Sequence, residues 1–474
     1  MQAITQRGPR LQGSRTVHGR KVAVSFHPLA AAMAHTRRMD QRSLIAAIRF
    51  GLGPRPDQPL PGDVPAWLKA QIRPPETDLA LPEGWERPPT VADGLDLRRQ
   101  DELAPVEAGK PSRQVVLNGA EAQALIRNAV TTQTPFRERL VLFWANHLTV
   151  STREGAVRAL VGDFVRSAIR PHVGGRFEDM LVASTHHPAM LFYLNQNASV
   201  GPGSRIGLRQ GRGLNENLAR EVMELHSLSP AAGYSQEDVT EFARLLTGLT
   251  VERLREPLGS RFQPDAHEPG PRTILGQRFE EGPGQVDTAL RWLANHEATH
   301  RHLAVKLARH FVADDPGPGT VEYLFGVLRD TRGDLGAVAE ALVDLPEAWQ
   351  APLSKLRSPQ DFMIASYRLL NGGADAAQVV AGGMRSLGQD IWSAPAPIGW
   401  PDTADGWVSA EGMIQRMEVA YNVAGRHSRL DPNNLLDAAL GPLARHETVQ
   451  AVRRAGSTRD GLTLLLASPE FQRR

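Results

Sequence analysis

The stretch FRERLVLFWANHLTV, residues 136–150, decides the fold class of this chain. Its apolar residues from Leu140 to Trp144 would cover the whole circumference of a helix, so we expect a long helix that is buried on all sides. Near its end the same helix carries Asn146 and His147, which would then be buried polar groups that need partners. A helix of this kind is typical of the interior of a large helical protein.

Most of the chain after residue 119 has the same helical spacing, with apolar residues at i, i+3 and i+4 and almost no strand-like alternation. We therefore predict a mostly α, large multi-helix globular protein with little or no sheet. Two long irregular segments rich in Gly and Pro, 195–213 and 249–281, interrupt the helices, and loops of this length are usually functional or disordered. The other segments with helical spacing are 120–130, 156–170, 176–183, 214–228, 235–248, 285–294, 297–312, 317–329, 334–344 and 358–370.

Composition agrees with a soluble globular protein: 474 residues, of which 41% are hydrophobic and 22% charged. The chain has 54 Lys and Arg against 52 Asp and Glu, a balance that does not favour a nucleic-acid partner. Because the sequence contains no cysteine, disulfides, thiolate metal sites and thiol nucleophiles are excluded. No run of about 18 apolar residues occurs, so we expect no membrane span.

We divide the chain into an N-terminal extension, residues 1–39, and one helical domain, residues 40–474. The extension begins basic, and its apolar stretch is broken by His27 and Pro28, which argues against a secretory signal. We expect it to be flexible. Within the domain, residues 51–111 are dense in proline and are predicted to form an irregular segment that wraps around the helices, with short helical pieces such as 66–72.

The helix predicted over 214–228 carries two carboxylates on one polar stripe, Glu221 and Glu224, with Arg220 beside them. Carboxylates at i and i+3 without a lysine at i+4 repel each other unless a cation lies against them. We therefore predict that Glu221 is poorly exposed and pairs with Arg220, Arg244 or a metal ion. The alternative is a solvated helix face on which Arg220 is the partner.

Two hypotheses for function follow from these residues. The enzyme hypothesis places a polar site between helices 136–150 and 215–228, with Glu221, Glu224 and His147 as catalytic residues. The same three residues and His267 are the candidate ligands of a divalent metal, the one cofactor that this residue set would suit. The competing hypothesis is a non-catalytic helical scaffold or partner-binding protein, in which these groups are caps and buried ion pairs and His147 is a core histidine with satisfied hydrogen bonds.

Residues 296–300 read HEATH, a literal match to the zincin pattern in which two histidines bind zinc beside a glutamate base. We expect a helix to begin at Glu297, with Asn295 and His296 forming the turn and cap before it. His296 would then lie off the regular helical face, and the imidazoles of His296 and His300 would not converge. A zinc metallohydrolase that uses His296, Glu297 and His300 is therefore the minor alternative.

Several segments together resemble the bacterial domain-of-unknown-function 1800 family, from about residue 40 to the end of the chain. The resemblance implies a largely helical protein, often exported and often encoded beside another exported family. It therefore implies a periplasmic or exported location and another exported protein as partner, whereas the missing signal sequence predicts a cytoplasmic protein. The matching segments are VLFWANHLTVS (141–151), PAMLFYLNQ (188–196), NENLAREVMELHSL (215–228), GYSQEDVTEFARLLTG (233–248), HEPGPRTILG (267–276) and PAPIGWP (395–401), followed by Trp407.

The chain departs from the usual family sequence at both histidine motifs. The family's FWHNH is FWANH here, so Ala145 replaces a histidine and His147 alone remains of the pair. This weakens a metal site made of two histidines on that helix. Where the family commonly has His-Pro-Ala-Thr-Ala, this chain has HEATH, and proline at the second position is typical of a helix start. The resemblance thus supports Glu297 as the first helical residue.

Overall fold

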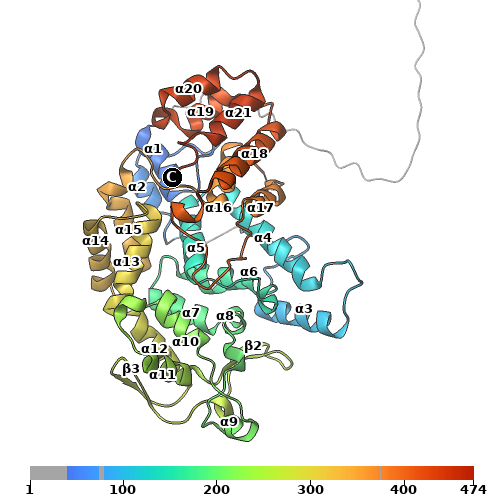
Figure 1. The fold of residues 1–474 in the computed structure, drawn as a ribbon, viewed down its shortest axis with the longest axis vertical. Helices are drawn as coiled ribbons and strands as arrows, with labels where there is room; N and C mark the ends of the chain where they lie inside the picture. The colour runs from blue at the N-terminus through green and yellow to red at the C-terminus, as the bar shows by residue number, and fades with distance from the viewer. Residues whose placement is uncertain (1–39, 74–78, 374) are drawn as a thin grey trace, which may run out of the picture. The chain divides into compact units, whose positions relative to one another are not determined.

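Figure 1 shows the ribbon of the computed structural model, which describes residues 40–73, 79–373 and 375–474. These residues belong to one compact unit. The chain is 59% helical and 4% strand, so the predicted mostly α fold with little sheet is confirmed. The predicted flexible extension, residues 1–39, lies outside the described residues. No helix in the described part of the chain is long and apolar enough to cross a membrane.

Among the described residues, the first part of the domain contains ten α-helices, several of them short. They are α1 (Gln41–Ile45), α2 (Val64–Lys69), α3 (Val91–Leu103), α4 (Arg113–Thr131), α5 (Pro135–His147), α6 (Val161–Asp163), α7 (Phe177–His186), α8 (Pro188–Tyr193), α9 (Arg205–Gln210) and α10 (Asn217–Glu221).

The second part contains most of the longer helices. They are α11 (Gln236–Leu246), α12 (Pro283–Ala294), α13 (Glu297–Phe311), α14 (Pro318–Asp330), α15 (Leu335–Asp344), α16 (Pro359–Leu369), α17 (Ala376–Ser386), α18 (Ala410–Arg426), α19 (Pro432–Ala439), α20 (His446–Arg453) and α21 (Thr458–Ala467).

The buried apolar side chains form two clusters. The larger cluster includes the apolar faces of α5, α7 and α11 to α15. The smaller one is formed by α16 to α21 with one face of α4, and Figure 1 shows α18 to α21 grouped near α16 and α17. On α5, Phe143 and Trp144 belong to the larger cluster, while Leu142 packs against the smaller one. The helix therefore lies between two cores, which is why its sequence is apolar on all sides.

Helix α5 ends three residues earlier than predicted. Pro135 occupies its first turn, where a missing backbone N–H costs nothing. At the other end, the hydroxyl of Thr149 donates to the carbonyl of Asn146 at 2.6 Å. A side chain thus satisfies one of the carbonyls that a helix end leaves without a partner, and the chain leaves the helix after His147.

Two segments predicted as regular helices contain π-helical turns. Residues 156–170 are divided into a 3₁₀ turn, α6 and a π-helix at Phe164–Ile169. The segment 214–228 begins as α10 and continues as a π-helix at Val222–His226, here called the 222–226 π-helix. Apolar spacing alone does not distinguish a short π-helix from the α-helix around it, because both bury one continuous face.

The segment 249–281, predicted to be irregular, instead contains two small antiparallel hairpins. Strands β1 (Leu249–Glu252) and β2 (Gly259–Phe262) pair with Leu249 opposite Phe262, and β3 (Arg272–Ile274) pairs with β4 (Gln277–Phe279). The second hairpin turns through Leu275 and Gly276, both with positive φ, which is typical of a tight two-residue hairpin turn. The strands are too short to show clear alternation in the sequence.

The proline-rich segment 51–111 is also more regular than predicted. The short helical piece predicted at 66–72 overlaps α2, and the segment also contains the thirteen-residue α3, which begins at a capping box between Thr90 and Asp93. The side chain of Thr90 accepts from the backbone of Asp93, and the Asp93 carboxylate accepts from the backbone of Thr90. The cap fixes the helix start, although Gly94 and Leu95 are the buried residues of a largely polar helix.

Candidate functional site

Glu221 and Glu224 lie close to each other, as predicted, but without a cation partner for Glu221 among the described residues. Both side chains are half-buried. Burial and the charge of Glu224 raise the pKa of Glu221 above its usual value. Arg220 pairs instead with Glu216 at 3.0 Å, and Arg244 pairs with Glu241. The expected ion pair of Glu221 with Arg220 or Arg244 is therefore not formed.

His147 and His267 are both hydrogen-bonded to the backbone inside the fold. His147 is 3% exposed, and its Nε2 donates to the carbonyl of His226 at 3.1 Å. The Nδ1 of His267 donates to the carbonyl of Thr247 at 2.8 Å. The other ring nitrogens, Nδ1 of His147 and Nε2 of His267, are buried and have no hydrogen-bond partner among the described residues, so the alternative of a fully satisfied core histidine is met only in part.

The structure therefore does not support a metal site shared by Glu221, Glu224, His147 and His267. In the part of the chain that the structure describes, no three His, Asp or Glu side chains come together in a geometry that would hold a metal ion. On a regular α-helix, His226 would point away from the face that carries Glu221 and Glu224. The structure has a π-helix at these positions, and the backbone carbonyl of its last residue, His226, accepts from His147.

The HEATH segment begins a helix where the sequence predicted. Helix α13 starts at Glu297, and His296 is its N-cap, accepting through Nδ1 from the backbone of Ala298 at 3.1 Å. His300 is 3% exposed, and neither of its ring nitrogens has a hydrogen-bond partner among the described residues. Burial, followed by the neighbouring charge of His296, lowers the pKa of His300 to about 4.

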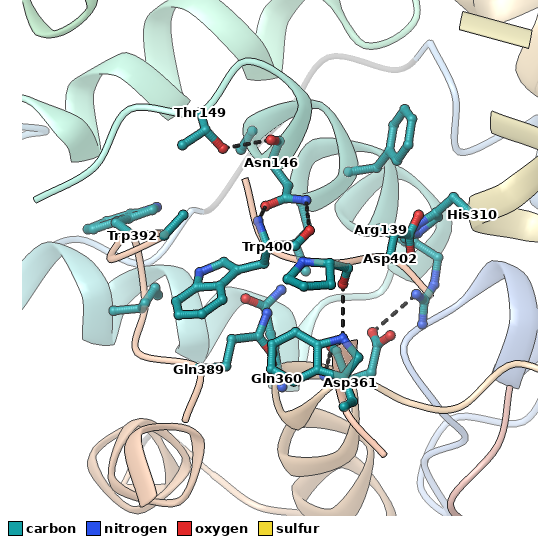
Figure 2. A pocket seen from close by; sticks show the side chains of 18 of the residues that line it. Arg139, Asn146, Thr149, His310, Gln360, Asp361, Gln389, Trp392, Trp400 and Asp402 are labelled. Carbon is teal, nitrogen blue, oxygen red and sulfur yellow. Dashed lines mark hydrogen bonds and ion pairs between the residues drawn. The ribbon is translucent and has the colours of Figure 1, made fainter. Parts of the chain in front are cut away.

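A cavity of about 100 Å³ lies in a region for which the sequence predicted no site. It is bordered by the second half of α5, the start of α16 and the segment 389–407, and it is here called the α5 cavity (Figure 2). Figure 2 shows Trp392 on one side, the side chains of Arg139, His310 and Asp402 on the other, and Trp400 between them. Its aromatic lining comes mainly from Phe143 and the tryptophans of the 389–407 segment.

Asn146 fixes the loop that carries Trp400. Its side-chain Nδ2 donates to the carbonyl of Trp400 at 3.0 Å, and its Oδ1 accepts from the backbone N–H of Trp400 at 2.8 Å (Figure 2). The preceding residue, Gly399, has φ of +84°, and a Cβ there would lie 2.5 Å from the carbonyl oxygen of Asn146. The close approach of the loop to α5 therefore requires glycine.

Trp392 is held with φ of +52°, an unusual conformation for a bulky residue. Its carbonyl accepts from the backbone N–H of Thr152 at 2.8 Å and from the Thr152 hydroxyl at 3.0 Å. These two hydrogen bonds hold the strained residue beside the cavity. Strain of this kind is common where a side chain must be presented to a ligand.

Several hydrogen-bond donors around the cavity have no partner among the described residues. They are the indole N–H groups of Trp392 and Trp400 and the side-chain amide N–H groups of Gln389. Gln389 itself is 5% exposed, and its Oε1 accepts from the backbone of Gln360 at 2.8 Å, which fixes the orientation of the amide. Donors left free in a nearly buried side chain are favourable for a ligand that offers acceptors.

The charged side chains of the cavity, in contrast, are paired with one another. Asp361 lies 3.1 Å from Nη1 of Arg139 and 2.8 Å from Nε of Arg474, and Arg474 also contacts Asp402 at 3.2 Å. Burial would raise the pKa of Asp361, but the charges of Arg139 and Arg474 outweigh it and lower the pKa to about 2. Two arginines thus balance two ionised aspartates, and the cavity has no net charge from these groups.

His310 completes this cluster. Its Nδ1 lies 2.8 Å from Oδ2 of Asp402, which fixes the tautomer with the proton on Nδ1. Its Nε2 is buried and has no hydrogen-bond partner among the described residues. Burial lowers the pKa of His310 to about 4, so the imidazole is neutral at neutral pH and Nε2 retains its lone pair.

Parts of this site had signals in the sequence. Asn146 was predicted to be a buried polar group that needs a partner, and PAPIGWP (395–401) was one of the matching segments. Ala145 lines the cavity at the position where the usual family sequence has a histidine. Nothing local in the sequence indicates that Asn146 pairs with Trp400, because the two residues are 254 positions apart.

Comparison with known proteins places the chain in a family but adds no activity. No curated protein and no solved structure matches the chain significantly. The family model described as "protein of unknown function (DUF1800)" matches residues 45–473, which include α5, α16 and the whole 389–407 segment. The chain therefore belongs to this family, DUF1800, over nearly its whole length.

Proposed function

We propose that this protein binds a small, uncharged, hydroxyl-rich molecule of the saccharide type in the α5 cavity. The observation that carries the proposal is the set of free donors on Trp392, Trp400 and Gln389 around a cavity whose charges are already paired. Hydroxyl oxygens accept hydrogen bonds from such donors, and the indole rings offer flat apolar surfaces for the C–H faces of a sugar ring.

Size and charge support a neutral ligand of this class. A single water needs about 10–15 Å³ of cavity space, so a cavity of about 100 Å³ accommodates a ligand the size of several waters, such as one pyranose ring. An anionic or cationic ligand would have to break contacts that already exist in the cavity. Arg139 is already paired with Asp361, and Asp402 already accepts from His310. A mostly apolar cavity with a few placed polar groups is the usual form of a small-molecule site.

Intrinsic fluorescence provides a direct test, because the cavity contains tryptophan. We expect a panel of neutral monosaccharides to include at least one that changes the emission of the protein and saturates. Gln389→Ala should weaken that binding about tenfold, because the amide is a free donor at the cavity. Trp85→Phe, which removes a tryptophan outside the cavity, should leave the affinity as in the wild type.

The result that would overturn the proposal is equally direct. If no neutral saccharide changes the fluorescence, or if Gln389→Ala binds the responding sugar as tightly as the wild type, the α5 cavity is not a saccharide site. The thermal unfolding temperature of Gln389→Ala is measured alongside, so that a folding defect is recognised.

The Asp402–His310 pair favours a second candidate, catalysis on the bound molecule. A carboxylate that orients an imidazole and leaves Nε2 free is the arrangement of a general base. In this proposal Nε2 of His310 accepts a proton from a ligand hydroxyl, and Asp402 stabilises the imidazolium that forms. Conversion of the responding sugar or its derivatives by the wild type, but not by His310→Gln, would support an enzyme; binding without conversion would support a non-catalytic binding protein.

A further inference from the structure

A second, larger cavity of about 350 Å³ lies near the end of the described chain and shares no residue with the α5 cavity. It is here called the C-terminal groove. Its walls are largely apolar, and two arginines stand among its lining residues: Pro352, Leu353, Leu440, Leu443, Arg445 and Arg473.

The groove lining also includes one carboxylate, that of Glu470, which does not neutralise both arginines. Glu470 accepts from the backbone N–H of Arg445 at 2.7 Å and from the hydroxyl of Thr448 at 3.0 Å. Its ion pair is with Nε of Arg445 at 3.3 Å. Burial would raise the pKa of Glu470, but these hydrogen bonds outweigh it, so the group stays ionised at neutral pH. Its charge is therefore committed to Arg445.

Arg473 has no such partner. Its backbone forms an antiparallel bridge with Leu356, which fixes its position, but its guanidinium makes no hydrogen bond or ion pair with any described residue. The residue is exposed and still lines the groove. Arg445 and Arg473 against the single Glu470 leave one excess positive charge at an apolar groove.

We propose that the C-terminal groove binds an alkyl chain that carries one anionic head group, such as a fatty-acid carboxylate. The alkyl chain lies against Leu353, Leu440 and Leu443, and the carboxylate forms a charge-assisted hydrogen-bonded pair with the guanidinium of Arg473. The combination of an apolar wall and an unpaired cation selects for this chemistry over a neutral alcohol of the same length. The proposal is independent of the α5 cavity and its ligand.

Calorimetric titration of the full chain with octanoate tests both parts of the proposal. Octanol supplies the same chain without the charge, and acetate supplies the head group without the chain. We expect octanoate to bind at least about fivefold more tightly than octanol, and acetate not to bind measurably, because neither contact alone is strong at an open surface.

Two variants separate the charge from the apolar wall. Arg473→Gln should weaken octanoate about fivefold and leave octanol unchanged, since the exposed side chain can be replaced without disturbing the core. Leu443→Asn should weaken both ligands, with its unfolding temperature measured as a check. Arg454→Gln, an exposed arginine outside the groove, is the matched control and should bind octanoate as the wild type does.

The proposal is wrong if octanoate does not bind, if octanol binds as tightly as octanoate, or if Arg473→Gln leaves octanoate binding unchanged. Octanoate binding that is lost equally in Arg454→Gln would also contradict it, because the attraction would then be the general charge of the surface.

Discussion

Asn146 is the residue on which the shape of the α5 cavity depends most directly. Its amide makes both hydrogen bonds with the backbone of Trp400, as a neighbouring strand would do. In Asn146→Ala, the partly buried N–H and C=O of Trp400 lose both partners, and we expect a loss of about 2 kcal/mol in the free energy of unfolding. Trp400 should also become more accessible, which quenching of tryptophan fluorescence by acrylamide would detect.

Two further substitutions serve as controls for this prediction. Asn146→Asp keeps the acceptor for the N–H of Trp400 but loses the donor, so its stability should not exceed that of the wild type. Asn433→Ala changes an exposed asparagine at the start of α19 and should shift stability by less than about 0.5 kcal/mol. Equal stability and equal quenching in Asn146→Ala and wild type would show that the pair does not hold the loop.

At the scale of elements, the end of the 222–226 π-helix is closed by side chains from other helices. The carbonyl of Leu225 accepts from Nε2 of His302 on α13 at 3.2 Å, and the carbonyl of His226 accepts from Nε2 of His147 on α5 at 3.1 Å. Carbonyls at a helix end have no partner in their own helix. Three elements are thus joined by two imidazoles, with the rings of His147 and His302 5.9 Å apart.

This arrangement predicts that His147 stabilises the fold through the hydrogen bond that its Nε2 donates to the carbonyl of His226. His147→Leu should lower the free energy of unfolding by about 2 kcal/mol, because the buried carbonyl of His226 loses its partner. His147→Gln places an amide N–H near the position of Nε2 and should recover part of that loss. Chemical denaturation of the two variants measures the difference.

A purely apolar role for the ring makes the opposite prediction: His147→Leu would then be at least as stable as His147→Gln. A metal-ligand role makes a third, in which addition of a divalent ion stabilises the wild type and neither variant. The three outcomes are distinguishable in the same denaturation experiment.

Elements with strong local signals were predictable from the sequence, and those that depend on distant partners were not. Helix α5 and the start of α13 at Glu297 follow from apolar spacing and from local cap residues. The 222–226 π-helix does not, because its last carbonyls are satisfied by His147 and His302 from elsewhere in the chain. The α5 cavity was missed for the same reason: its walls meet through pairs far apart in sequence.

At the scale of the whole molecule, the structure buries several imidazoles in their neutral form. Burial is the largest cause of a lowered pKa in each: to about 3 in one of them, to about 4 in three, and well below the ordinary value in the fifth. All five lie on α5, α13 or the 222–226 π-helix, so their titration affects one region. The groups are His147, His226, His300, His302 and His310.

These pKa values make the protein sensitive to acid in a definite pH window. Below pH 6.5 the unfolded chain protonates these imidazoles while the folded protein does not until about pH 4, so the unfolded state binds more protons and stability falls as the pH falls. The contribution of Asp361 is lost at lower pH, because its folded pKa of about 2 lies below an unfolded value of 3.8.

We therefore predict that unfolding near pH 5 takes up about four protons, and that each proton lowers the free energy of unfolding by about 1.4 kcal/mol per pH unit. Urea unfolding at pH 7, 6 and 5 measures this slope.

His300→Leu should remove about one proton from the uptake, because its imidazole is 3% exposed and has no hydrogen-bond partner among the described residues. His446→Leu, at an exposed position on α20, should leave the slope unchanged. An uptake of less than about one proton between pH 6 and 5 would show that these imidazoles are protonated or solvated in the folded protein, and the core between α5 and α13 would then be more open than its packing indicates.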